Sequence, residues 1–138
     1  MKCALFTASV GLVLVFAAMP LPAHHSMRAE YDLSKAITIQ GVVTKLEWMN
    51  PHVRVYLDVK SAAGQVVNRE IELGGAPNSL QRAGWSRDDF KLGNQITVDI
   101  SLAKNGGHLA CARAITLADG RVMQGPTKDW DGQPLDKP

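Results

Sequence analysis

Two segments of this chain alternate apolar and polar residues with a period of two. The first runs from Val53 to Lys60 and the second from Gln95 to Leu102. Successive side chains of a β-strand point to opposite faces of its sheet, so the pattern predicts strands with one buried and one wetted face. A helix would repeat its apolar residues every three or four positions instead. The alternation therefore restricts the chain to antiparallel β architectures with one solvated face.

Other segments add further strand candidates. Residues 37–48 also alternate, but the phase slips by one near Gly41, which predicts a bulged and sharply bent first strand. A third strand is expected over residues 67–73, and Val122 is expected to begin a short extra strand. In the fifth strand one face is predicted to carry Leu109, Cys111, Ile115 and Leu117.

One short helix is expected between the third and fourth strands. Pro77 suits its first turn and Gly84 suits the residue that follows its end. Ser86 and Asp89 have the spacing of a capping box for a second short turn. This order of elements predicts an all-β fold with one short helix, a small five-stranded OB-like antiparallel barrel over residues 36–124. An immunoglobulin-like sandwich needs about seven strands and no helix at this place, so it fits less well.

The N-terminal 23 residues have the order of a secretory signal peptide. Lys2 supplies the positive charge, residues 4–18 are almost wholly apolar, and the segment ends at the small residue Ala23. The apolar stretch is shorter than the roughly 20 residues that a membrane span needs, although an uncleaved anchor is the alternative. We expect cleavage after Ala23 and a mature protein without a membrane span, in the periplasm or outside the cell.

The mature chain is expected to have three parts: an N-terminal arm (24–35), the barrel domain (36–124) and a flexible C-terminal tail (125–138). The 15 basic residues of the whole chain include Lys2 and are interspersed with 13 acidic ones. A nucleic-acid partner is therefore not expected, because it would require a basic stripe.

Several side chains are expected to be inert. Cys111 would be the only cysteine left after cleavage, which excludes an internal disulfide, and we expect it to be buried. The strand carboxylates Asp58, Glu70 and Glu72 are expected to face solvent. The chain contains no nucleophile elbow, HExxH, CxxC or P-loop motif, so no catalytic residue is predicted and the protein is expected not to be an enzyme.

Two histidines stand where the mature chain is expected to begin. If cleavage follows Ala23, His24 carries the free α-amine and His25 adds a second imidazole. Amine and imidazole nitrogens suit Cu(II) and its tetragonal geometry, so copper or another late divalent metal is the candidate cofactor. His52 is a candidate third ligand if the arm folds back. The alternative is that His24 and His25 are solvated or cap the barrel through hydrogen bonds.

A second candidate site is the connection between the first two strands, Trp48 to His52. The ring of Trp48 offers stacking area, and Asn50 and His52 offer hydrogen-bonding groups, so these three residues are predicted to bind a ligand at the barrel mouth. In the alternative interpretation Trp48 belongs to the core and His52 only orders the turn.

The order of several short motifs resembles a family of small exported bacterial proteins of unknown function. The resemblance covers roughly residues 24–123 and implies export and a shared fold, but no reaction. Two positions depart from the family pattern, Met27 where a Phe is usual and Val53-Arg54 after the NPH triplet. The motifs are His-His-Ser (24–26), Glu-Tyr-Asp (30–32), Glu-Trp-x-Asn-Pro-His (47–52), Glu-Leu (72–73), Pro-Asn-x-Leu-x-Arg-x-Gly-Trp (77–85) and Leu-Gly (92–93).

Two functional hypotheses follow from these observations. The first is an exported, non-catalytic binding or accessory protein that takes a small ligand or a divalent metal at the arm and the first hairpin. The second is a structural or protein-interaction module of the cell envelope, in which exposed strand edges pair with a partner protein and the histidines play no part.

Overall fold

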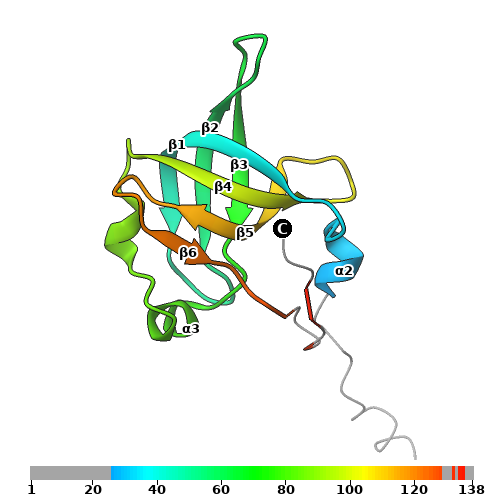
Figure 1. Cartoon of the computed structure of the whole chain (residues 1–138), viewed down its shortest axis with the longest axis vertical. Helices are drawn as coiled ribbons and strands as arrows, with labels where there is room; N and C mark the ends of the chain where they lie inside the picture. The colour runs from blue at the N-terminus through cyan, green and yellow to red at the C-terminus, as the bar shows by residue number, and fades with distance from the viewer. Residues whose placement is uncertain (1–25, 129–131, 133, 136–138) are drawn as a thin grey trace, which may run out of the picture.

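The computed structural model describes residues 26–128, 132, 134 and 135. Within them, the strands form one sheet that curls into a barrel (Figure 1). The order across the sheet is β3-β2-β1-β4-β5-β6, and β3 also pairs with β5. The strand bounds are β1 (Ile37–Glu47), β2 (Arg54–Lys60), β3 (Val66–Glu72), β4 (Gln95–Leu102), β5 (Leu109–Thr116) and β6 (Val122–Gln124).

The pairing of β3 with β5 closes the barrel, and it is parallel, with Glu72 opposite Cys111. All other strand pairs of the sheet are antiparallel. Five strands cannot alternate in direction all the way around a closed ring, so at least one neighbouring pair must be parallel. The expected five-stranded, OB-like, all-β fold is confirmed, and this closing pair is its one parallel element.

The bend of β1 is confirmed, but the expected position of its bulge is wrong. The register with β2 shifts between Val43 and Lys45, three residues after Gly41. Val43 is buried, whereas Val42 is 39% exposed, so the phase has not yet slipped at Gly41. Gly41 instead allows β1 to pass close to β2, because a Cβ atom at this position would lie 3.0 Å from the Asp58 carbonyl oxygen.

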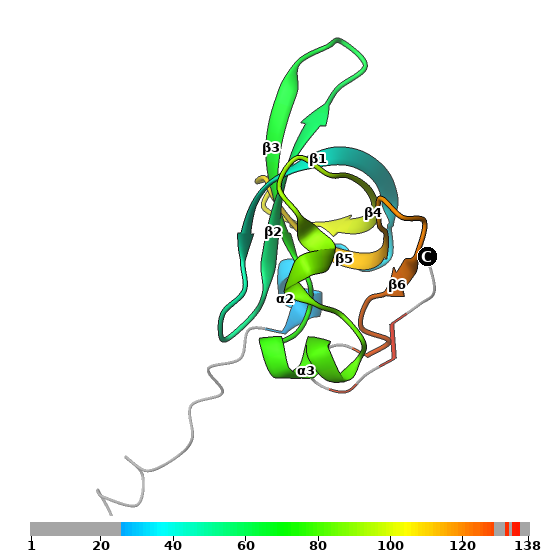
Figure 2. The same ribbon diagram turned by 90° about the vertical axis from the view of Figure 1, so that its left-hand side faces the viewer.

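The segment between β3 and β4 follows the expected capping signals. Helix α3 (Pro77–Arg82) begins with its proline, and Gly84 after it has a φ of 88°. The 3-10 helix η1 (Arg87–Phe90) carries the predicted capping box of Ser86 and Asp89. Figure 2 shows α3 below the ring of strands. Trp85 and Phe90 are buried in the core, as expected for Trp85.

A second apolar cluster lies outside the barrel, between β5 and the N-terminal arm. Helix α2 (Met27–Glu30), which the sequence analysis did not predict, lies beside the barrel (Figure 1). Met27 and Tyr31 are fully buried there against Cys111.

The predicted common face of β5 is wrong because the strand has a register shift. The pairing with β4 passes from Ala112 to Ala114, so Arg113 is an extra residue. Leu109 and Cys111 therefore face the arm, whereas Ile115 and Leu117 face the barrel core together with Ala110 and Ala112.

The described part of the C-terminal segment contacts the arm. The carbonyl oxygen of Pro134 accepts a hydrogen bond of 2.7 Å from the Arg28 guanidinium, and Leu135 packs against the outer cluster. The expected flexibility of residues 125–138 stays a prediction. The short β6 agrees with the extra strand expected from Val122. Among the described residues, no helix has the length and apolar character of a membrane span.

Candidate functional site

The most unusual polar residue of the structure is Glu72, at the end of β3. Its side chain is only 3% exposed, so the expectation that it faces solvent is wrong. β3 is flanked there by β2 on one edge and β5 on the other, with Glu72 opposite both Arg54 and Cys111. Tyr31, which follows α2, contacts the Glu72 carboxylate. An outward-pointing carboxylate is thereby removed from water.

The two oxygens of this carboxylate have different surroundings. Oε2 accepts a hydrogen bond from the Tyr31 hydroxyl at 3.3 Å and lies 3.8 Å from Arg54 Nη2. Oε1 lies 2.8 Å from His52 Nδ1, yet it accepts no hydrogen bond of ordinary geometry from a described residue. His52 and Glu72 are therefore within ion-pair distance of each other, although Oε1 accepts no hydrogen bond from a described residue.

Burial sets the electrostatics of the site. It raises the pKa of the Glu72 carboxyl above its usual range, against the lowering effect of His52 and Arg54. Glu30 on α2 adds a second negative charge nearby and raises this pKa further. Burial, with the charge of Glu72, also raises the pKa of Tyr31, which stays a protonated donor. Burial thus disfavours the charged form of the Glu72 carboxyl, and a cation close to it would favour that form.

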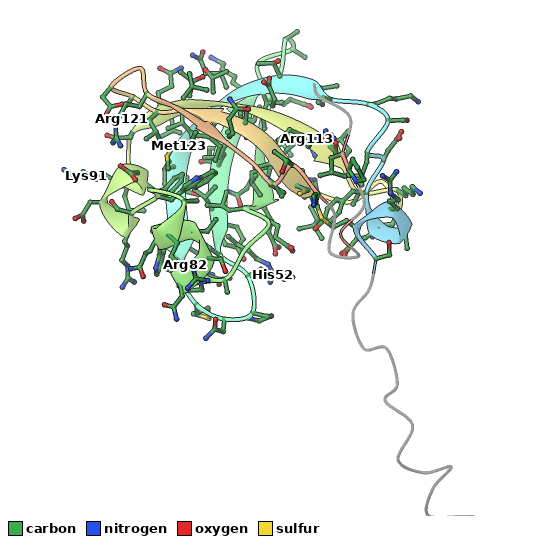
Figure 3. The ribbon with its side chains drawn as sticks, turned by 60° about the horizontal axis from the view of Figure 1, so that its bottom comes forward. His52, Arg82, Lys91, Arg113, Arg121 and Met123 are labelled. Carbon is green, nitrogen blue, oxygen red and sulfur yellow. The ribbon has the colours of Figure 1, made fainter. Side chains whose placement is uncertain are left out.

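The first hairpin connection brings His52 to this carboxylate. The Asn50–Pro51 peptide bond is cis, and His52 follows it with a side chain that is 26% exposed. Figure 3 shows His52 at the same end of the barrel as Arg82 of α3. Trp48 is half-buried against the barrel core, and Asn50 is exposed. The structure therefore joins His52 to Glu72 and directs part of the Trp48 ring to the core.

The candidate ligands His24 and His25 lie outside the described residues. The arm is described from Ser26 onward, and its next residue, Met27, is fully buried. Because Tyr31 also contacts Glu72, the described arm is held against the same corner of the barrel as His52. Met27 packs in the outer apolar cluster, which is its role in the fold.

The described residues do not by themselves form a complete metal centre. In that part of the chain, no three His, Cys, Asp or Glu side chains gather closely enough to hold an ion. His52 and Glu72 form a pair of potential ligands, one nitrogen and one oxygen. Cys111, which lies opposite Glu72 on β5, is buried as predicted, and burial raises the pKa of its thiol to about 12. Its expected lack of reactivity stays a prediction.

Glu72 and Tyr31 were not among the site residues predicted from the sequence. One signal was present, because Glu72 stands between Ile71 and Leu73, which both belong to the barrel core. A charged residue at the end of such a strand is solvated only if nothing covers the outer face. The arm that covers it lies 41 residues away in the sequence.

A second surface feature is a groove between α3 and β6. It has a volume of about 550 Å³. Figure 3 shows Arg121 and Met123 along β6 at its border. The lining residues are Ala83, Gly84, Trp85, Arg121, Val122, Met123 and Gln124.

In the described part of the chain β6 pairs with β5 alone, and its residues line this groove. The backbone bonds at the two ends of β6 join Arg121 and Gly125 to β5. In an antiparallel pair, hydrogen-bonded positions alternate, so the peptide groups of Val122 and Gln124 point away from β5. Val122 is also 59% exposed. These groups are available to a further strand.

The fold and the site together define an OB-like barrel whose outer face carries a buried glutamate in contact with a partly exposed histidine, beneath an N-terminal arm. The chain belongs to the Family of unknown function (DUF6152), whose model matches residues 12–111. This agrees with the expected membership of a family that has no established activity. No curated protein and no solved structure matches the chain.

Proposed function

We propose that this protein is an exported, non-catalytic accessory protein that binds a late divalent metal, with copper as the first candidate. The observation that supports the proposal is the 2.8 Å contact between His52 Nδ1 and the buried carboxylate of Glu72. Imidazole is the commonest side-chain ligand of late divalent metals, and a buried carboxylate beside it favours a bound cation.

The arm supplies the remaining ligands in this proposal. His24 and His25 directly precede Ser26, where the described arm begins. Cleavage after Ala23 would give His24 a free α-amine, so one residue would offer two nitrogens. With His52, the protein would present imidazole and amine nitrogens, the donors that favour Cu(II) over hard ions such as Mg²⁺ and Ca²⁺.

The test begins with the intact mass of the protein recovered from the periplasm, followed by calorimetric titration with Cu(II) and Zn(II). We expect a chain that begins at His24 and binds one equivalent of Cu(II). His24→Ala and His52→Ala should each weaken binding at least about tenfold, as loss of a ligand does. The matched control is His108→Ala, since His108 is an exposed histidine far from the pair in sequence.

A further variant separates the amine from the side chains. One extra alanine before His24 keeps all imidazoles and moves the α-amine away from the first of them. The proposal expects weaker Cu(II) binding by this variant. Binding no tighter than to the urea-denatured chain would contradict the metal-binding function.

The free edge of β6 favours a second candidate function, that of an envelope interaction module. The outward-pointing peptide groups of Val122 and Gln124 could pair with an extended segment of a partner protein. A photo-crosslinking residue at position 122 should then give one discrete adduct in cells. The same residue at position 92, where Leu92 is 68% exposed in a loop, is the control and should give none. Equal labelling at both positions would contradict this function.

A further inference from the structure

One oxygen of the buried Glu72 carboxylate lacks a hydrogen-bond partner. Within the described residues, Glu72 Oε1 is one of two buried side-chain polar atoms that have no hydrogen-bond partner. Buried polar atoms nearly always have a hydrogen-bond partner, and a bound ion is one physical reason for an exception. The other atom, Arg54 Nε, lies 3.2 Å from Glu70 Oε1, so it has an oppositely charged neighbour. Glu72 Oε1 faces His52 Nδ1 at 2.8 Å.

The neighbours of Glu72 orient the carboxylate. The Tyr31 hydroxyl and Arg54 Nη2 both lie on the side of Oε2, at 3.3 and 3.8 Å. Oε1 is left on the side of His52. The contacts therefore direct one oxygen towards the imidazole and hold the other in place.

The spacing of the two facing atoms matches that of ligands on one ion. Metal–ligand distances of about 2.0–2.1 Å with angles between about 90° and 110° place two donor atoms roughly 2.8–3.4 Å apart. The distance between His52 Nδ1 and Glu72 Oε1 is 2.8 Å. A hydrogen bond would explain the same distance, but Oε1 accepts none from a described residue.

We propose that Glu72 Oε1 and His52 Nδ1 bind the same divalent ion, so that Glu72 is itself a ligand. This inference rests on the proposed function and adds a residue and a selectivity to it. One carboxylate oxygen beside imidazole nitrogens favours Cu(II) or Zn(II) and disfavours Cu(I), which prefers sulfur. Met27 and Cys111 face the apolar cluster under the arm, so the site selects the divalent state.

Tyr31 connects the site to the arm. Its hydroxyl holds Oε2, and its backbone continues from α2, whose Met27 is buried beside it. An ion on Oε1 would therefore bind a carboxylate that the described arm also contacts, through Tyr31.

The test compares Glu72→Gln with Glu70→Gln, its neighbour on the same strand. We expect Glu72→Gln to lose at least about tenfold in Cu(II) affinity, and Glu70→Gln to stay within about threefold of the unchanged protein. Loss of an outer-sphere partner of a ligand also costs about 10–100-fold, so affinity alone does not identify a ligand. The deciding measurement is the Cu(II) electron paramagnetic resonance spectrum at saturating protein.

Replacement of a carboxylate ligand changes the donor set of the ion, so Glu72→Gln should alter the g and hyperfine values, whereas Glu70→Gln should not. An unchanged spectrum for saturated Glu72→Gln would show that Glu72 only orients His52, and would overturn the inference while the proposed function stands. If the unchanged protein binds no Cu(II) or Zn(II), the proposed function fails first.

Glutamine has nearly the size of glutamate, and its thermal unfolding without metal checks that the variant folds. Should it fail to fold, Glu72→Asp serves in its place, because it keeps the charge and withdraws the oxygen from His52. A Glu72→Asp spectrum identical to that of the unchanged protein would overturn the inference in the same way. Titration with Cu(I) under reducing conditions tests the selectivity, and binding as tight as that of Cu(II) would contradict it.

Discussion

Replacing Tyr31 with phenylalanine removes one oxygen atom from the buried polar cluster and leaves the aromatic ring in place. The Tyr31 hydroxyl donates to Glu72 Oε2 at 3.3 Å, and both side chains are buried. Without it, the nearest cation to Oε2 is Arg54 Nη2 at 3.8 Å. The substitution therefore tests how strongly the arm is tied to the barrel through this carboxylate.

The expected magnitude follows from the geometry. A hydrogen bond to a charged group contributes about 1.5–3 kcal/mol to the free energy of unfolding. At 3.3 Å the bond is longer than the usual hydroxyl range of about 2.5–3.0 Å, so we expect the lower end, about 1.5–2 kcal/mol. In a Glu72→Gln background the acceptor is neutral, and the loss should fall to about 0.5–1 kcal/mol.

The assay is a double-mutant cycle by urea unfolding of the metal-free mature protein at pH 7, followed by tryptophan fluorescence. Tyr56→Phe is the matched control, since its hydroxyl donates at 3.0 Å to Glu47 on a less buried face. Its loss should stay within about 0.5 kcal/mol. If Tyr31→Phe destabilises the protein equally with and without the Glu72 charge, to within about 0.3 kcal/mol, the reasoning is refuted.

Three further predictions concern other parts of the fold. Gly125→Ala should lower the free energy of unfolding by about 1–3 kcal/mol, because the added Cβ would lie 2.6 Å from a carbonyl oxygen of β5; an unchanged urea midpoint would contradict this. Cys111 should resist alkylation at pH 8 in the folded protein and react fully in urea, since it is buried and its pKa is raised to about 12; equal rates in both states, measured by mass, would contradict its placement. Burial raises the pKa of Asp89, but Arg121 and Ser86 outweigh this and hold it below the usual range. The Asp89 charge therefore adds its full stability at pH values above the pKa of Asp89 in the unfolded chain, about 4. This stability is lost as the pH falls through the lower pKa that Asp89 has in the folded protein. The difference in unfolding free energy between the protein and Asp89→Asn should be largest near neutral pH and vanish in acid, and a difference that grows in acid would contradict the sign.

The local pattern of the sequence determined most of the strands and their connections. The alternation of residues 53–60 and 95–102 predicted β2 and β4, because each has one face in the core and one in water. The signals at Pro77 and Gly84 predicted where α3 begins and ends, since capping depends on residues adjacent in the chain. Such features rest on short-range sterics and on a single buried face, which a one-dimensional pattern records.

The bulges show where this information ends. A residue inserted into a strand shifts the phase of every following side chain, but its position depends on the register with the partner strand. The slip of β1 lies after Val43 and not at Gly41, and the slip at Arg113 separates Cys111 from Ile115. A phase change in the pattern indicates that a bulge exists within a few residues, and the partner strand decides which residue bulges.

The candidate site depended on tertiary structure even more. The sequence pointed to His52 as a chemically capable residue, but it placed Glu72 in water. The burial of Glu72 results from three segments that are distant in the chain: the parallel partner β5, the first hairpin with His52, and the arm with Tyr31. Each of these contacts removes water from the carboxylate, and the flanking core residues Ile71 and Leu73 do not by themselves indicate that the outer face is covered. The types of donor atom were therefore determined by the sequence, whereas their convergence and their exclusion from water were decided by the closed barrel and the arm packed on it.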